Sequence, residues 1–275
     1  MRDNDLQVLR ALTAARESRP ELADLLDFYY DLYEVQFEVK EQLAEPPVRD
    51  EVARRWRLEG GIPQLSFTQL GIESVSFAAL VERVSEVLRH HNPNWPQAQS
   101  GQTSEDLVVL AREIFETWDT LTAREPNEAG QPLAVESSIA LAVGFALAPY
   151  LQRAAEAILP RLDLSEWTES HCPVCGGRPN LAVLESSRGA RQLMCSRCNS
   201  LWNYARVSCP FCHSREEQKF FPSEDGVYRL YVCPACQRYL KTIDLRSMFR
   251  EVQLPVERLL TVGMDLAAQE KGYRA

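Results

Sequence analysis

Apolar residues recur at helical spacing through the first part of the chain. The spacing predicts a short helix near residues 51–58 and longer helices over residues 6–15, 20–43, 76–91, 103–118 and 139–159. The helix over residues 20–43 has a wide apolar face that includes tyrosines, and we interpret these as core positions. Amphipathic helices of this length can share one core, so the pattern predicts an all-α domain over residues 1–165.

Helix-start and helix-breaking residues separate these elements. Ser18 and Glu21 have the spacing of a capping box, and Thr103 and Asp106 give a second helix start. Paired prolines and paired glycines break the chain between the second and third long helices. The polar stretch at residues 124–132 predicts a surface loop.

The helix over residues 139–159 is the most apolar in the sequence. Its unbroken apolar run, residues 139–148, is too short to span a bilayer, so we expect no membrane insertion. We predict the central buried helix of the helical domain, bent or split at Pro149.

The pattern changes in the stretch that holds the cysteines. All eight cysteines lie in four Cys-x-x-Cys pairs, which begin at Cys172, Cys195, Cys209 and Cys233. Nineteen, ten and twenty residues separate successive pairs, so a long loop, a short link and a second long loop follow one another. The residues before Cys195 also resemble those before Cys233. Together the spacing and the text predict a duplicated unit.

Each predicted unit can bring four thiolates to one point. Two Cys-x-x-Cys turns joined by a hairpin form the ligand pattern of a tetrahedral metal site. Four buried thiolates need a cation to balance their charge, so the metal would also stabilise the fold. We predict two metal ions per chain, iron or zinc, held by Cys172, Cys175, Cys195 and Cys198 and by Cys209, Cys212, Cys233 and Cys236.

Other interpretations of the cysteines fit less well. A dithiol oxidoreductase typically has a single pair. Four disulfides need an oxidising compartment, whereas the N-terminal residues show no secretory signal, so we expect a cytoplasmic protein. The ten-residue link permits an interleaved arrangement in which the first and third pairs share a metal, but the repeat favours sequential sites. His171 and His213 flank cysteines and are alternative ligands.

Charge is divided unevenly along the chain. Residues 172–250 contain twelve Lys and Arg against six Asp and Glu, a balance of +6, and the other residues contain eighteen against thirty-three, a balance of −15. Two zinc tetrathiolate sites would lower the first value to about +2, and two ferric sites to about +4. Neither is the strongly basic stripe typical of nucleic-acid binding, so we expect no nucleic-acid partner.

These patterns predict the organisation of the whole chain. A mainly α N-terminal domain is followed by two tandem rubredoxin-like or zinc-ribbon-like β units and a C-terminal helix. The predicted bounds are residues 1–165, 166–207, 208–250 and 251–275, and the last helix extends from Pro255 to Glu270.

The ordered motifs of the cysteine region resemble those of the FdhE family, which are accessory proteins of formate dehydrogenase formation. The resemblance covers the chain from Trp167 to its end well and the helical region more loosely. The matching positions are Cys172-Pro-Val-Cys175-Gly with Pro179, Cys195 and Cys198 with Trp202, Arg206-Val with Cys209 and Cys212, Cys233 and Cys236 with Tyr239-Leu-Lys241, and Met264-Asp265 with Gly272-Tyr273.

The resemblance implies a cytoplasmic bacterial protein without catalytic turnover of its own. Such a protein would bind the catalytic subunit of respiratory formate dehydrogenase and assist its assembly. The resemblance also implies rubredoxin-like sites, for which iron is a candidate. One position departs from the family pattern, since Glu257-Arg258 stands where a pair of acidic residues is expected. The sequence leaves the oligomeric state open, a homodimer included.

Residues after the second pair of each unit are candidates for partner binding. They are Trp202, Arg206, Tyr239 and Lys241. Trp202 and Tyr239 could instead cover the sulfurs as a small apolar lid. Arg206 and Lys241 are harder to explain as packing, and we expect them to form a basic patch that meets an acidic partner.

Two other functions and one other metal site compete with this interpretation. A redox or sulfur-handling accessory enzyme would act through an iron–thiolate site, but a closed four-thiolate site has no open coordination position. A nucleic-acid-binding ribbon is suggested by arginines interleaved with aromatic residues, and the charge balance opposes it. His90 and His91 are neighbours on a helix and point about 100° apart, so we interpret them as a solvated helix end.

Overall fold

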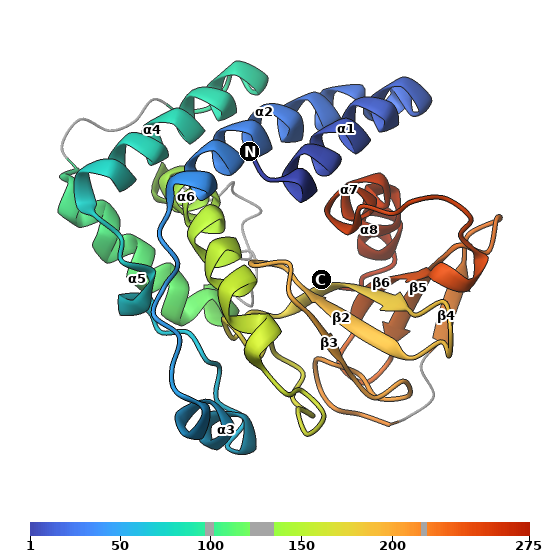
Figure 1. The fold of residues 1–275 in the computed structure, drawn as a ribbon. Helices are drawn as coiled ribbons and strands as arrows, with labels where there is room; N and C mark the ends of the chain where they lie inside the picture. Colours follow the sequence, from blue (N-terminus) through green and yellow to red (C-terminus); the bar gives the residue numbers. More distant parts are fainter. Residues whose placement is uncertain (97–101, 122–134, 216–218) are drawn as a thin grey trace. The chain divides into compact units, whose positions relative to one another are not determined.

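The structure is a computed structural model that describes residues 1–96, 102–121, 135–215 and 219–275 (Figure 1). The chain forms two compact units. Unit 1 consists of Met1–Pro47 and Ser66–Ala154, and unit 2 consists of Val48–Leu65 and Ala155–Ala275. The surface loop expected at residues 124–132 lies outside the described part of the chain.

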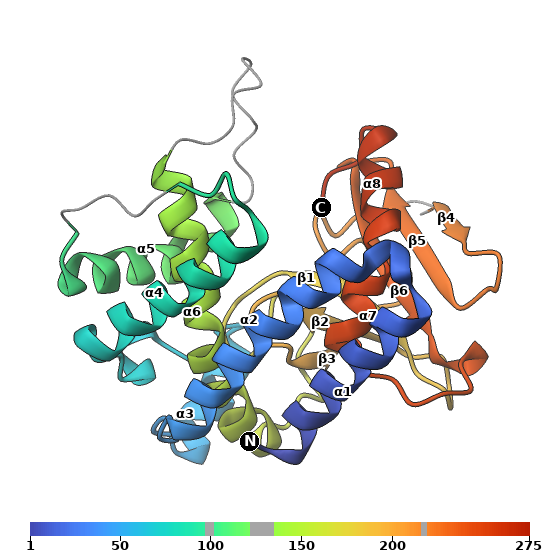
Figure 2. The same ribbon diagram turned by 90° about the horizontal axis from the view of Figure 1, so that it is seen from above.

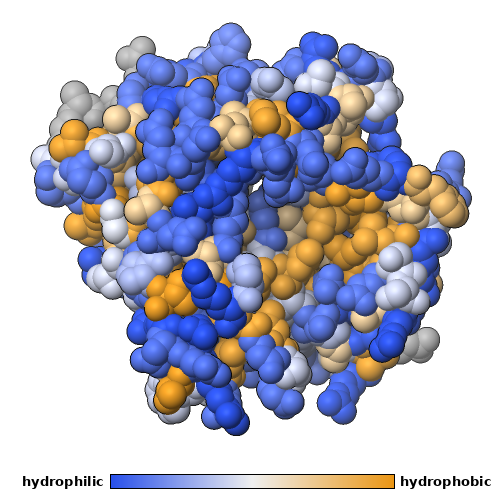
Figure 3. Space-filling view, in the orientation of Figure 1, coloured by the Kyte–Doolittle hydropathy of each residue, from blue (hydrophilic) through white to orange (hydrophobic). Residues whose placement is uncertain are grey.

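Unit 1 is built from helices, as the apolar spacing predicted. They are α1 (Asp3–Ser18), α2 (Ala23–Gln42), α4 (Ser74–His91), α5 (Ser104–Leu121) and most of α6 (Val135–Ile158). Fully buried side chains come from each of them and include Leu12, Leu32, Phe77, Ile114 and Leu147. The outer sides of α1, α2 and α4 are mainly hydrophilic on the face that Figure 3 shows. This division between an apolar interior and a polar exterior is what amphipathic helices produce.

The capping predictions have different outcomes at the two helix starts. At the start of α5, Thr103 and Asp106 bond reciprocally: the Asp106 N–H donates to Thr103 Oγ1 at 3.2 Å and the Thr103 N–H donates to Asp106 Oδ2 at 2.9 Å. The box predicted at Ser18 and Glu21 is wrong. Ser18 ends α1 and its hydroxyl donates back to the Ala15 carbonyl, because α1 extends further than its apolar pattern indicated.

The apolar helix α6 is buried and continuous. Pro149 lies inside it, so the predicted split does not occur. Ala142, Val143 and Ala146 are at most 1 % exposed. Residues 138–161 are long and apolar enough to cross a membrane by length and composition, and 56 % of their most apolar window is buried within the structure. Burial of this kind is typical of a core helix, as the apolar run predicted.

Unit 2 is organised around a mixed sheet. Its strands are β1 (Pro179–Leu184), β2 (Arg191–Cys195), β3 (Leu201–Asn203), β4 (Lys219–Pro222), β5 (Tyr228–Cys233) and β6 (Arg238–Asp244), in the spatial order β3-β2-β1-β6-β5-β4. Strands β1 to β3 belong to the first cysteine unit and pair antiparallel with one another, and strands β4 to β6 do the same in the second.

The two cysteine units are halves of one sheet. Strands β1 and β6 pair in parallel, with Leu181 opposite Lys241 and Leu184 opposite Asp244. The sequence predicted two tandem ribbons and did not indicate that they share a sheet. Because β1 and β6 are far apart in the chain, no local pattern reveals this contact.

The C-terminal segment packs on this sheet as two helices rather than one. The predicted helix is interrupted at Thr261, between α7 (Leu254–Leu260) and α8 (Val262–Glu270). Ala268 of α8 packs in a buried cluster with Leu230, Val232 and Tyr239 of β5 and β6. In Figure 2 the red α7 and α8 lie close to β5 and β6.

Residues 48–65 join unit 2 although they stand between two helices of unit 1 in the sequence. They contain α3 (Glu51–Glu59), whose first turn is capped by Asp50, which accepts from the Ala53 N–H at 2.8 Å. The Gln64 N–H donates to the Pro173 carbonyl and the Leu65 N–H to the Val174 carbonyl, both at 2.9 Å. This segment therefore pairs by its backbone with the first cysteine turn.

Candidate metal centres

The four Cys-x-x-Cys turns share one backbone conformation. The residue after each second cysteine has a positive φ: 75° at Gly176, 61° at Asn199, 59° at His213 and 53° at Gln237. This left-handed residue lets the turn close on itself, and the Gly176 N–H donates to the Cys172 carbonyl at 3.0 Å. Equivalent bonds close the turns that begin at Cys209 and Cys233, at 3.0 and 2.9 Å.

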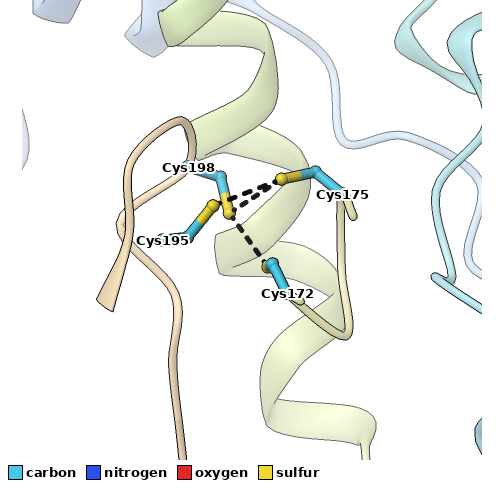
Figure 4. Close-up of side chains that lie close together, drawn as sticks. All are labelled: Cys172, Cys175, Cys195 and Cys198. Atoms are coloured by element: carbon cyan, nitrogen blue, oxygen red, sulfur yellow. Dashed lines mark hydrogen bonds between the residues drawn. The ribbon is translucent and has the colours of Figure 1, made fainter. Parts of the chain in front are cut away.

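The turns bring the eight cysteines into two groups of four. The first group is Cys172, Cys175, Cys195 and Cys198, and the second group is Cys209, Cys212, Cys233 and Cys236. Within each group the ligand atoms all lie within 4.8 Å of one another. Figure 4 shows the four sulfurs of the first group facing a common centre. The sequential pairing predicted from the repeat is confirmed, and the interleaved arrangement is wrong.

The sulfur positions fit a tetrahedral metal ion. In the first group three pairs of Sγ atoms lie 3.5 Å apart, and in the second group two pairs lie 3.6 and 3.7 Å apart. A tetrahedron with metal–sulfur bonds of ~2.3 Å places its sulfurs ~3.8 Å apart. A disulfide would need sulfurs about 2.0 Å apart. The donor set suits zinc and iron alike.

Electrostatics in the first group favour a bound cation. Burial raises the pKa of the Cys172 and Cys198 thiols, while hydrogen bonds from the neighbouring thiols lower the pKa of Cys175. Burial thus opposes the ionisation of Cys172 and Cys198 when no cation is bound. A divalent or trivalent cation removes this restriction, because it balances all four thiolates.

The thiols of the second group also have pKa values shifted in opposite directions, and this group is less buried than the first. Burial raises the pKa of Cys209 to about 11 and also raises the pKa of Cys236. Burial opposes ionisation of Cys233 as well, but its pKa is lowered, since hydrogen bonds from the Cys236 and Ala235 backbone and from the Cys212 and Cys209 thiols together outweigh the burial. The Phe211 N–H donates to Cys209 Sγ at 3.4 Å, as the Arg197 N–H does to Cys195 Sγ in the first group.

Side chains close around the first group on several sides. Ser200 Oγ lies 3.1 Å from Cys198 Sγ, and the Arg197 side chain is buried beside Cys195. A Cβ added at Gly177 would lie 2.9 Å from Cys195 Sγ and 2.7 Å from Arg197 Cδ. Only glycine fits at this position without displacing a ligand or the arginine.

The two histidines beside the cysteines make other contacts. His171 Nε2 lies 3.1 Å from the Gly61 carbonyl oxygen, and His213 Nδ1 lies 3.2 Å from Tyr204 Oη. Four cysteines complete each group without them.

The residues predicted to bind a partner lie in different surroundings. Trp202 is 1 % exposed and its indole N–H donates to the Glu169 carbonyl. Tyr239 is 5 % exposed and its hydroxyl donates to Asp265 Oδ1 at 2.9 Å. Both therefore pack in the core of unit 2, in line with the packing alternative. Arg206 is exposed.

The predicted basic patch of Arg206 and Lys241 is wrong. Lys241 is 4 % exposed, and its ammonium donates to Asp265 Oδ2 at 2.6 Å and to the Arg258 carbonyl at 2.9 Å. Burial lowers the pKa of Lys241, and the Asp265 charge opposes that shift. Lys241 is buried because α8 packs against β6 and places Asp265 beside the ammonium group.

Glu257 and Arg258, which stand where the family pattern has two acidic residues, both make structural contacts. Glu257 is 1 % exposed, accepts from the Tyr228 hydroxyl at 2.6 Å and pairs with Arg250 at 2.6 Å. Arg258 donates to Asn199 Oδ1 at 3.1 Å. These contacts attach α7 to both halves of the sheet.

The contacts of Arg191 have no local signal in the sequence, and the pair His90 and His91 lies in other surroundings than the solvated helix end that we expected. Arg191 is buried, donates to the Ala205 and Ser208 carbonyls and stacks over Tyr204, so it ties β2 to the residue just before Cys209. In unit 1, Asp31, His90 and His91 form a further group whose ligand atoms lie within 4.8 Å, with His91 Nε2 2.8 Å from Asp31 Oδ2. The helical angle between the histidines therefore does not keep their ring nitrogens apart.

The fold and the cysteine groups define a class of protein with N-terminal helices, a sheet that holds two four-cysteine groups, and C-terminal helices. Residues 171–206 match the family model described as FdhE, central domain. An FdhE homologue of Haemophilus influenzae (strain PittEE) is 28 % identical over 263 residues, which are 92 % of this chain and 80 % of that protein.

An FdhE homologue of Aquifex aeolicus is 34 % identical over 133 residues, which are 46 % of each chain, so this match spans less than half of that relative. The crystal structure of the FdhE protein from Pseudomonas aeruginosa superposes with a TM-score of 0.65 at 20 % identity, over 99 % of this chain and 93 % of that one. The resemblance of this chain to the FdhE family is confirmed.

Proposed function

We propose that the protein is an accessory factor that binds the catalytic subunit of formate dehydrogenase in the cytoplasm and assists its assembly. The observation that carries the proposal is the pair of closed four-cysteine groups within a fold that matches an FdhE structure over nearly the whole chain. In this proposal the metals hold the sheet of unit 2 in the form that the client recognises.

The chemistry of the groups supports a binding role over an enzymatic one. Four protein sulfurs fill a tetrahedral ion, so a substrate has no open position to occupy. Apart from these groups, Asp31, His90 and His91 are the one set of three or more potential ligands that the described residues bring together. We therefore assign the protein no catalytic turnover.

A redox or sulfur-handling role is the second candidate, and one observation favours it. Cys212 is exposed, whereas all four cysteines of the first group are buried. An exposed thiolate ligand can leave its metal and react, which a buried ligand cannot easily do. Iron in the second group would further support this role, and zinc would favour binding alone.

Capture of the client tests the proposal. The tagged full-length chain would be expressed in anaerobic cells that make formate dehydrogenase, purified without oxygen and analysed by mass spectrometry. We expect the catalytic subunit to co-purify, and metal analysis to give two ions per chain. Arg206→Glu reverses the one exposed charge among the four predicted contact residues and should weaken capture if that charge meets an acidic surface.

A matched variant separates loss of contact from loss of fold. Arg188→Glu changes another exposed arginine of unit 2, and it should leave capture unchanged. Absence of the catalytic subunit from the folded, metal-loaded wild-type preparation would contradict the proposed function.

A further inference from the structure

The two four-cysteine groups differ in how much of each turn reaches solvent. In the first group all four cysteines are at most 4 % exposed, and the intervening Pro173, Val174 and Arg197 are buried as well. In the second group Cys212 is exposed and Cys236 is half-buried, while Pro234 and Ala235, which separate Cys233 from Cys236, are exposed. The two groups have the same ligands, but solutes can reach the second group more easily than the first.

The difference in exposure arises from the residues that cover the cysteine turns. Backbone pairing with Gln64 and Leu65 covers the first cysteine turn, and Pro63 lies so close that a Cβ at Gly176 would be 3.1 Å from it. In the second group the Cys212 turn continues into His213 and Arg215, which are exposed. The neighbouring strand β4 is exposed along its whole length.

Cys212 also has a partner for covalent chemistry. Its Sγ lies 3.6 Å from Cys233 Sγ, and Cys233 is 3 % exposed. A reagent that reaches the second group therefore meets Cys212 first and finds a shielded second sulfur within reach of it.

We propose that the second group is an oxidation site for peroxides, in which Cys212 reacts first and Cys233 resolves the product. The proposal depends on the metal occupancy proposed above and is independent of the formate dehydrogenase client. Its consequence is a protein that loses one metal under oxidising conditions and keeps the other.

The reaction balances in two steps. The Cys212 thiolate leaves the metal and attacks one peroxide oxygen, the O–O bond breaks, hydroxide departs, and the sulfur becomes a sulfenic acid after a two-electron oxidation. The Cys233 thiolate then attacks the Cys212 sulfur, the S–O bond breaks with loss of a second hydroxide, and a Cys212–Cys233 disulfide forms. Only two thiolates remain for the metal, so it dissociates.

The test uses the full-length chain loaded with zinc in the absence of oxygen and then exposed to hydrogen peroxide. Native mass spectrometry follows the number of zinc ions, and peptide mapping locates the modified cysteines. We expect one zinc to leave at least about tenfold faster than the other, since oxidation follows exposure. The early product should contain the Cys212–Cys233 disulfide and four unmodified cysteines in the first group.

Two variants of the second group sharpen the result. Cys212→Ser should slow the loss of zinc, whereas Cys236→Ser should still form the Cys212–Cys233 disulfide. Where either variant does not load, dimedone trapping on the wild-type chain reports the first sulfenic acid, which we expect at Cys212. Equal rates of loss from both groups, earlier loss from the first, or first modification at a cysteine other than Cys212 would overturn the proposal. A wild-type chain that binds no zinc or iron would overturn it together with the proposed metal sites, whereas failed client capture alone would leave it standing.

Discussion

The two four-cysteine groups have the same ligands and the same turn conformation, and they belong to the two halves of one sheet. They differ in how far they are exposed to solvent. The first is enclosed by a backbone-paired segment, a buried arginine and a glycine that has no room for a side chain. The second exposes Cys212 and the residues between Cys233 and Cys236. The ligand set therefore determines which metals fit, and the surrounding residues determine how securely a metal is held.

Removal of both metals should have the largest effect on the structure. We expect the cysteine region to unfold and the helices of unit 1 to stay folded. Unit 1 has a buried core that contains no cysteine, whereas the metals would crosslink the cysteine turns of unit 2, and we expect the sheet to lose its order without them. After chelation under reducing conditions, circular dichroism should keep most of its helical signal while the contribution of the sheet is lost. Complete loss of the helical signal would show that unit 1 cannot fold without the metals.

Ligand removal should next show that the first group contributes more stability than the second. Cys172→Ser with Cys175→Ser should lower the free energy of unfolding by about 3–5 kcal/mol, because Cys195 and Cys198 stay buried but lose the cation that crosslinks the two turns. Cys209→Ser with Cys212→Ser should cost roughly half as much, since that group is partly solvated. Chemical denaturation and metal analysis measure both effects.

Each double variant should retain one metal with an unchanged spectrum. Loss of both metals from either variant would show that the groups are coupled, and Arg191 would then be the first contact to examine. Equal losses of stability would remove the distinction between an enclosed group and an open one.

A smaller effect is expected from crowding the first group. Gly177→Ala should destabilise unit 2 by about 1–3 kcal/mol, because the added methyl displaces Arg197 or Cys195. Gly263→Ala is the matched control, since a Cβ at Gly263 meets no atom within 4 Å. Thermal unfolding of the metal-loaded proteins compares the two. Equal stability of Gly177→Ala and Gly263→Ala would mean that the residues around the first group can move aside for a methyl group at little energetic cost.

The sequence was sufficient for features that depend on local spacing. Two Cys-x-x-Cys turns joined by a hairpin can meet only in a few ways, so the ligands of both groups followed from the repeat. The long helices followed from their apolar faces, and the start of α5 followed from Thr103 and Asp106. Each of these features can be recognised from residues that lie close together in one stretch of the sequence.

Features that depend on distant contacts were not predictable. The parallel pairing of β1 with β6 joins residues about sixty positions apart, such as Leu181 and Lys241. Lys241 looked like a surface charge because the partner that buries it, Asp265, lies on a helix whose position the sequence does not specify. The unequal exposure of the two groups has the same origin, because residues 63–65 reach the first turn from a distant part of the chain.

Metal exchange without any oxidant tests most directly whether identical ligand sets differ in access. Zinc-loaded protein would be mixed anaerobically with excess cadmium, and native mass spectrometry would follow the replacement of each ion. We predict two phases, with one cadmium entering early, and we predict that the fast phase is absent from the Cys209→Ser, Cys212→Ser variant, which retains only the first group. Replacement of both ions in a single phase, or a fast phase that persists in this variant, would contradict the account.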